Sequence, residues 1–171
     1  METQKWYKNP EMLVALTALF IGLVTAAISI YSAYIDRAYA KASVWPKVEL
    51  SRSFIGNSFS YGVTNNGTGP ALIQYATVRV NGNYIKHWSD LPEFSHAIQS
   101  HFSTLTLPSG HHIKPIEYKG EGLEAVLKLD NSVEIELCYC SIYADCWVVN
   151  RSNTTRQVEI CEVSREKAFL E

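Results

Sequence analysis

An uncharged stretch of 24 residues, from Met12 to Ile35, constrains the fold of this chain more than any other feature. The nearest charges on either side belong to Glu11 and Asp36. As an α-helix, the stretch would be about 36 Å long, which is enough to cross a hydrocarbon core of about 30 Å with some tilt. The sequence therefore predicts a transmembrane helix over residues 12–35, and the lipid bilayer is its expected partner.

A cleaved signal peptide is the alternative interpretation of this segment. Ala38-Tyr39-Ala40 has the small-x-small form of a cleavage site. The uncharged stretch is, however, far longer than the roughly 7–15 residues of a signal-peptide core. We therefore expect an uncleaved anchor, that is, a single-pass protein of the cell (inner) membrane. Its orientation is left open, because Lys5 and Lys8 before the span nearly balance the basic residues after it.

Small residues form a stripe along one face of the predicted helix. They include the pattern Ala18-x3-Gly22-x3-Ala26, which allows two membrane helices to approach closely. This face indicates self-association or docking on a partner's helix, although small residues are also ordinary components of membrane helices. The whole stripe comprises Ala15, Ala18, Gly22, Ala26, Ser29 and Ala33.

The charge balance excludes one class of partner. The chain has 171 residues, with 15 Lys and Arg against 17 Asp and Glu, and a net charge of −2. A dedicated nucleic-acid binder would show an excess or a stripe of basic residues, so no nucleic-acid partner is expected. A hydrophobic content of 47% also argues against a disordered chain.

Beyond the span, the pattern changes to a period of two residues. Pro46 ends any continuing helix, and the alternation of Phe59, Tyr61 and Val63 with small or polar residues predicts a half-buried strand. Asn81-Gly82 is a favoured two-residue hairpin turn. About seven to nine short strands with frequent turns are typical of an antiparallel β-sandwich.

The predicted fold is mainly β, with one N-terminal transmembrane helix followed by an immunoglobulin-like antiparallel sandwich. One or two short helices are expected: one near residues 90–99, with Asp90 as its cap and Pro92 in its first turn, and a helical turn followed by a short strand in 120–129. The expected plan is a tail at 1–11, the span at 12–35, a juxtamembrane linker at 36–44, the sandwich at 45–163 and a C-terminal tail at 164–171.

Four cysteines lie in the last quarter of the chain, at Cys138, Cys140, Cys146 and Cys161. A hairpin that turns around Tyr143 would align the apolar residues of its two strands and place Cys140 opposite Cys146, within reach of a disulfide. A further turn at residues 153–154 would place Cys161 opposite Cys146 as a competitor. In this register Cys138 and Cys161 are separated by an intervening strand, so we expect one disulfide and two free thiols.

Two other states of the cysteines remain open. All four could hold zinc as a metal site, but the spacing C-x-C-x5-C-x14-C differs from the closely spaced pairs of structural zinc sites. All four could also be reduced and buried. An oxidised pair would place the domain outside the cytoplasm, which we slightly favour, whereas four free thiols would place it inside.

No familiar catalytic motif occurs in the chain. The patterns G-x-S-x-G, G-x-x-x-x-G-K-[ST], H-E-x-x-H and G-x-G-x-x-G are all missing from the sequence, so neither an enzyme nor a cofactor is predicted. The adjacent residues His111 and His112 would point to opposite faces of a strand, and we interpret them as an exposed pair near a turn.

Three blocks of sequence carry a resemblance to a known group. They are Ser43-Val44-Trp45-Pro46-x-Val48-Glu49-Leu50, Val63-Thr64-Asn65-Asn66-Gly67-Thr68-Gly69-Pro70-Ala71 and Cys138-Tyr139-Cys140-Ser141-Ile142-Tyr143-x-x-Cys146-Trp147. With these blocks the chain resembles uncharacterised single-span bacterial membrane proteins with a C-terminal immunoglobulin-like β domain. The resemblance implies no activity and no catalytic residues.

Two hypotheses of function follow from these features. The leading one is a membrane-anchored, non-enzymatic binding or assembly module that serves as an accessory subunit of a membrane complex. The alternative is a membrane-anchored sensor that responds to redox state or metal through its clustered cysteines.

Overall fold

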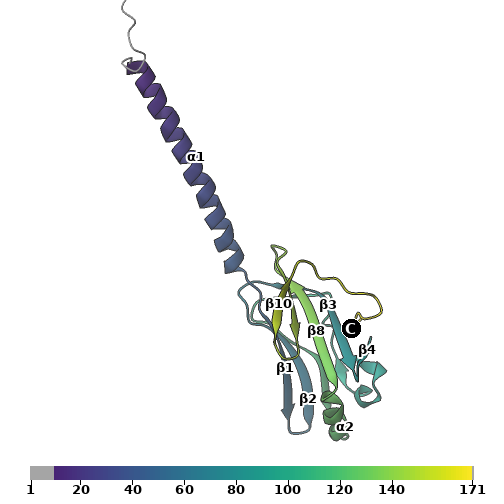
Figure 1. Ribbon diagram of the computed structural model, residues 1–171. Coiled ribbons are helices and arrows are strands. Elements are labelled where there is room, and N and C mark those ends of the chain that lie inside the picture. Colours follow the sequence, from purple (N-terminus) through teal and green to yellow (C-terminus); the bar gives the residue numbers. More distant parts are fainter. Residues whose placement is uncertain (1–9, 171) are drawn as a thin grey trace, which may run out of the picture. The chain divides into compact units, whose positions relative to one another are not determined.

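The computed structural model describes residues 10–170, which belong to two compact units that meet between Ala42 and Ser43. The first unit contains all but the last residue of the helix α1, Pro10–Ser43 (Figure 1). Pro10 occupies the first turn, where a missing N–H costs nothing, and Lys41 lies in the last turn, where a positive charge suits the helix dipole. The helix is long and apolar enough to cross a membrane.

The segment predicted as a juxtamembrane linker at 36–44 is helical, because α1 continues through it to Ser43. Residues 36–43 include three alanines, an arginine and a lysine, all of which favour the helix. Pro46 then prevents further helix, as expected. The tail predicted at 1–11 lies almost wholly outside the described residues.

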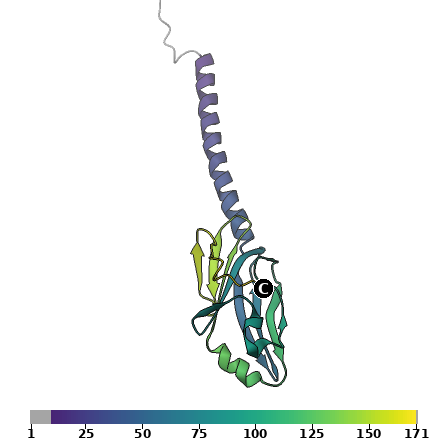
Figure 2. The ribbon, with the colours of Figure 1, turned by 90° about the vertical axis from the view of Figure 1, so that its right-hand side faces the viewer.

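The second unit is an antiparallel β-sandwich, which confirms the predicted mainly-β fold (Figures 1 and 2). One sheet has the order β1-β2-β7-β5; the other has the order β10-β9-β8-β3-β4, with β6 also paired to β3. The strands are β1 (Val48–Ile55), β2 (Ser58–Asn65), β3 (Ala71–Val80), β4 (Asn83–Ile85), β5 (Ile98–Gln99), β6 (Thr106–Leu107), β7 (His112–Lys119), β8 (Val133–Cys140), β9 (Cys146–Asn150) and β10 (Thr155–Val158).

Two hairpins match their predictions. Asn81 and Gly82 join β3 to β4 with φ angles of 50° and 82°, the left-handed conformation that a tight hairpin turn requires. In the hairpin β8–β9, Tyr139 lies opposite Trp147, and Leu137 lies opposite Val149. The apolar pattern therefore predicted the register of this hairpin correctly.

Strand β2 is more buried than predicted. Phe59, Tyr61 and Val63 lie in the core, but Ser60 on the opposite face is buried too. This happens because β2 is a central strand, flanked by β1 and β7. A Cβ atom added to Gly62 would lie 2.4 Å from Cε1 of His112, so the imidazole covers this part of the outer face.

The turn after β2 is held by the buried side chain of Asn65. Its Nδ2 donates to the carbonyls of Gly69 and Leu107 at 2.8 and 3.0 Å, and its Oδ1 accepts from the backbone N of Lys47 at 3.1 Å. A Cβ at Gly69 would lie 2.0 Å from the carbonyl oxygen of Val44. Glycine is therefore required where this turn packs against the segment that precedes β1.

The short helices differ from the prediction in detail. Instead of one helix near residues 90–99, there are two 3-10 turns, η2 (Trp88–Asp90) and η3 (Pro92–Phe94). The helix α2 (Leu123–Asp130) occupies the region where a turn and a strand were expected. Its residues Leu123, Val126 and Leu127 recur at helical spacing and pack on the core, which stabilises a helix here.

The predicted C-terminal tail at 164–171 is corrected, because its described part packs on the domain. Phe169 is 2% exposed, and its ring centroid lies 5.1 Å from that of Trp88. The backbone N of Phe169 donates to the carbonyl of Ala76, and the N of Leu170 donates to that of Lys86, both at 2.9 Å. The β domain therefore extends beyond residue 163.

Candidate functional site

A buried carboxylate at Asp130 organises a polar cluster between the two sheets. Asp130 ends α2 and has no exposed surface. It accepts hydrogen bonds from Tyr61 Oη at 2.5 Å and Arg151 Nη2 at 2.6 Å, and Arg52 Nη1 also donates to it. A buried charge requires such partners, and three polar groups provide them here. We call these four residues the Asp130 cluster.

The fold brings these residues together from distant parts of the chain. The register of β1 and β2 places Arg52 directly opposite Tyr61, and Arg151 follows the last residue of β9. Arg151 Nη1 also donates to the carbonyl of Val133 at 2.7 Å, and its guanidinium lies 5.5 Å from the centre of the Tyr61 ring. Arg151 is thus held by several interactions at once.

The cluster keeps Tyr61 in its neutral form. Burial raises the pKa of the Tyr61 phenol far above its ordinary value, and the hydrogen bond to Asp130 raises it further. The phenol therefore acts as a fixed donor. Sequence reasoning missed this cluster. No local pattern could have found it, because Tyr61 and Asp130 are 69 residues apart in the sequence.

A cavity of about 180 Å³ adjoins the Asp130 cluster between the sheets. Its walls are mainly apolar, and two lining residues, Ser51 and Arg52, are exposed, so the cavity reaches the surface beside β1. Three aromatic and three aliphatic side chains form most of the wall: Tyr61, Trp88, Phe102, Leu50, Val63 and Ile135.

The four cysteines form two disulfides. Cys140 is bonded to Cys146, the pair expected from the hairpin, with Cα atoms 4.0 Å apart. Cys138 is bonded to Cys161, with Cα atoms 5.8 Å apart. The expectation of two free thiols is therefore wrong, since no cysteine is free.

The error lies in the predicted path of the last strand. Trp147 faces Gln157, and β10 already ends at Val158. Cys161 therefore does not face Cys146 from a third strand. It lies instead in the irregular segment after β10, where it is bonded to Cys138 of β8.

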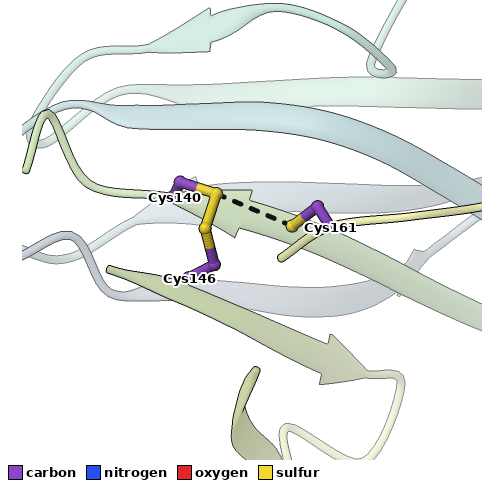
Figure 3. A group of neighbouring side chains, drawn as sticks. All are labelled: Cys140, Cys146 and Cys161. Carbon is purple, nitrogen blue, oxygen red and sulfur yellow. Dashed lines mark hydrogen bonds between the residues drawn. A yellow bond between two sulfur atoms is a disulfide. The ribbon is translucent and has the colours of Figure 1, made fainter. Parts of the chain in front are cut away.

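Three sulfur atoms of the two disulfides form a tight group (Figure 3). The Sγ atoms of Cys140 and Cys161, which belong to different disulfides, are 3.7 Å apart. The Sγ atoms of Cys140, Cys146 and Cys161 all lie within 4.8 Å of one another. A cysteine binds zinc as a thiolate, so these residues fit a metal only after the disulfides are reduced.

The small-residue stripe of α1 is exposed along the described helix. Nothing lies within 4 Å of a Cβ built at Gly22, and no residue of α1 is buried. The hydroxyl of Ser29 donates to the carbonyl of Thr25 at 2.9 Å, which satisfies it within its own helix. The stripe is therefore available for packing, and its role stays a prediction.

The two adjacent histidines have separate partners. His112 Nδ1 lies 2.8 Å from Oγ1 of Thr64, whereas His111 Nδ1 lies 3.4 Å from the carbonyl oxygen of Ser109. Both histidines are exposed. Each ring thus belongs to its own local hydrogen bond rather than to a shared site.

Strand β1 forms an edge of its sheet, and its two halves differ. In the first half, the backbone N and O of Leu50 bond to the side-chain amide of Asn153, at 2.7 and 2.9 Å. The backbone N and O of Leu50 therefore point away from β2. Because the direction of these groups alternates from one residue to the next in an antiparallel ladder, the backbone N and O of Arg52 and Phe54 also point away from β2. In the second half, Phe54 and Ile55 are 51% and 76% exposed. We call residues 51–55 the β1 edge.

Comparison with known proteins assigns no family to this geometry. A scan against protein-family models, a search of curated proteins and a search of solved structures each found no match. The structure itself defines the class: a β-sandwich with two disulfides that follows one long apolar helix. The candidate sites on this domain are the Asp130 cluster with its cavity, the sulfur group and the β1 edge.

Proposed function

We propose that this protein is a membrane-anchored, non-enzymatic binding and assembly module, and an accessory subunit of a bacterial inner-membrane complex. The length and composition of α1 support the anchor. The two disulfides support an extracytoplasmic location for the β domain, because such bonds persist in oxidising compartments and are rare in the cytosol.

The observation that carries the proposal is the β1 edge. Its outward backbone groups at Arg52 and Phe54 can pair with an extended strand of a partner protein. Soluble domains usually protect such an edge with a covering segment, a bulge or charges. Here Asn153 covers only the first half, and the second half ends with the exposed side chains of Phe54 and Ile55. The partner's strand covers this surface.

A photo-crosslinking experiment tests the edge. A photoreactive amino acid replaces Ile55 in the full chain, and the membranes are irradiated and then dissolved in mild detergent. We expect a discrete adduct with one partner protein. The matched control places the same amino acid at Glu124, which is 85% exposed on α2 and does not belong to the β1 edge. The additional change Phe54→Pro removes an outward N–H and should abolish the adduct.

Other outcomes would count against the assembly function. A monomer that forms no adduct from position 55, or adducts of equal yield and pattern from positions 55 and 124, would contradict it. Helix packing through α1 has a separate test, in which Gly22→Leu should weaken association measured in membranes. Unchanged association would remove the small-residue face from the proposal.

The location of the β domain is tested by reporter fusions. Alkaline phosphatase fused after Glu171 is active only when it is exported, since its own disulfides need an oxidising compartment. We expect the phosphatase fusion to be active. A second fusion at the same position, to a reporter that fluoresces only in the cytoplasm, should not fluoresce. The reverse pattern would place the domain in the cytoplasm.

A redox-responsive sensor is a second candidate, favoured by the 3.7 Å between Cys140 and Cys161 Sγ. A dithiol reductant would first reduce the Cys138–Cys161 disulfide and become oxidised itself. The Cys161 thiolate could then attack Cys140 Sγ and break the bond to Cys146, whose thiolate takes up a proton. Mass spectrometry after partial reduction should show a peptide pair linked through Cys140 and Cys161. Recovery of the two original pairs alone would contradict a sensor of this type.

A further inference from the structure

We propose that the cavity beside the Asp130 cluster binds a small apolar monocarboxylate, with a single ring or short chain inside the cavity and its carboxylate at Arg52. This binding site lies beyond the assembly function proposed above, because it concerns a small molecule held between the sheets rather than a protein on the β1 edge.

The size of the cavity fits one ring with a short substituent. Its volume is about 180 Å³, and apolar cavities of about 150 Å³ are known to take up benzene. The walls supply the matching surface, with the aromatic side chains of Tyr61, Trp88 and Phe102 on one part and aliphatic side chains such as Val63 and Ile135 on the rest. An apolar group that enters this space leaves water and gains contacts with these side chains.

The walls are held in place by the surrounding structure. The Tyr61 hydroxyl is fixed by Asp130, and its ring stacks on Trp88 with centroids 5.8 Å apart. Trp88 in turn stacks on Phe102 at 6.3 Å. A register shift between β2 and β7 near Tyr61 accompanies Pro115 on the cavity wall, where a fixed backbone opposes collapse. The cavity is thus a formed site rather than a gap that side chains can fill.

The charges at the mouth select an anion. Two guanidinium groups face the single carboxylate of Asp130, so the cluster carries one excess positive charge. Arg151 donates to Asp130 and to the carbonyl of Val133. Arg52 is bonded to Asp130 through Nη1, and its side chain is 50% exposed.

A guanidinium has five N–H donors, and the exposed part of Arg52 can present two of them to a second carboxylate. A carboxylate on the ligand would therefore neutralise the excess charge at the place where the cavity opens. A neutral ligand of the same shape would leave this charge unbalanced, so it should bind more weakly.

The test uses the full chain in detergent micelles and two fluorinated probes, 4-fluorobenzoate and 4-fluorobenzyl alcohol, followed by ¹⁹F NMR against empty micelles. We expect saturable binding of the benzoate and binding of the alcohol that is at least about tenfold weaker. Arg52→Gln should weaken benzoate binding roughly tenfold and leave the alcohol unchanged. The matched control is Arg79→Gln, since Arg79 is a similarly exposed arginine paired with Glu134 outside the cavity wall.

Filling the cavity provides the second arm. Ile135→Phe leaves Arg52 in place and should abolish binding of both probes, while the smaller change Val63→Leu should weaken both. Near-UV circular dichroism verifies that each variant is folded. Absence of saturable benzoate binding to the unchanged protein would overturn the site. Equal affinity for the alcohol would overturn the choice of a carboxylate, and undiminished binding to the folded, filled variants would place the ligand elsewhere.

Discussion

The β domain joins distant segments in two different ways. The Asp130 cluster connects Arg52 on β1 to the end of α2 across 78 residues by charge and hydrogen bonds alone. The Cys138–Cys161 disulfide connects β8 to the segment after β10 across 23 residues by a covalent bond. The first connection holds in any compartment, whereas the second exists only under oxidising conditions. The β domain is thus held by one connection that does not depend on the compartment and by a second connection that forms only in an oxidising compartment.

Removal of Asp130 should have the largest effect on stability. Asp130→Ala leaves two guanidinium groups without their buried counter-charge, and Tyr61 loses its acceptor. Breaking a buried ion pair by removing one partner costs about 3–5 kcal/mol. Urea unfolding of the full chain in micelles, followed by tryptophan fluorescence, measures this change. Glu124→Ala is the exposed control, and a loss below about 1 kcal/mol for Asp130→Ala would show that the cluster does not close the core.

Loss of the longer disulfide should come next. Replacing Cys138 and Cys161 together by serine opens a loop of 23 residues and should cost about 3 kcal/mol in the loop-entropy model. Replacing Cys140 and Cys146 together opens a separation of only 6 and should cost about 2 kcal/mol.

The same unfolding measurement compares the two double variants, with the unchanged chain treated with reductant as the reference. Equal losses, or a larger loss for the shorter loop, would contradict the ordering. If Asp130→Ala lowered the unfolding free energy less than either double variant, the disulfides rather than the buried charge would contribute most to the stability of this domain.

The same contrast separates what sequence patterns can predict from what they cannot. The helix, the Asn81-Gly82 turn and the register of β8 on β9 follow from local spacing, because a turn and an alternating face act over a few residues. The Cys140–Cys146 bond follows from that register. These features were accessible from the residues alone.

The errors share the opposite property. The Cys138–Cys161 bond depends on where β10 stops, and burial of Phe169 depends on how the last residues return to the core. The Asp130 cluster needs residues from β1, β2, the end of α2 and the turn after β9, which no periodicity connects. Each is decided by tertiary packing, which a single sequence does not encode in short-range patterns.

A smaller set of polar contacts is made by Asn153, whose side chain covers the first half of β1. Asn153→Ala removes both hydrogen bonds to Leu50, and we expect a loss of about 1–2 kcal/mol. Asn153 also has a φ of 57°, a conformation in which alanine is strained. Asn153→Gly relieves that strain but still lacks the bonds, so it serves as the matched control. If the glycine variant were as stable as the unchanged protein, the hydrogen bonds would contribute nothing to the stability of this domain.

The smallest effect should come from Asp90, an exposed counterpart of Asp130. Its carboxylate accepts from the backbone N–H groups of Lys86 and His87 at 2.9 and 3.0 Å, and these bonds lower its pKa below the ordinary value of 3.8. A carboxylate with a lowered folded-state pKa stabilises the protein above its unfolded pKa, and this contribution disappears as the pH falls through the folded value. Because Asp90 is 44% exposed, solvent screens the effect.

Asp90→Asn removes this charge while keeping the shape of the side chain. We expect the melting temperature of the unchanged protein to exceed that of the variant by roughly 1–2 °C near pH 7. The difference should stay constant down to about pH 4 and shrink below it, as Asp90 becomes protonated. Thermal melts at several pH values measure it. A difference in melting temperature that grows on acidification would mean that the protonated carboxyl is the better acceptor here. The charge of Asp90, unlike that of Asp130, would then not stabilise the backbone around it.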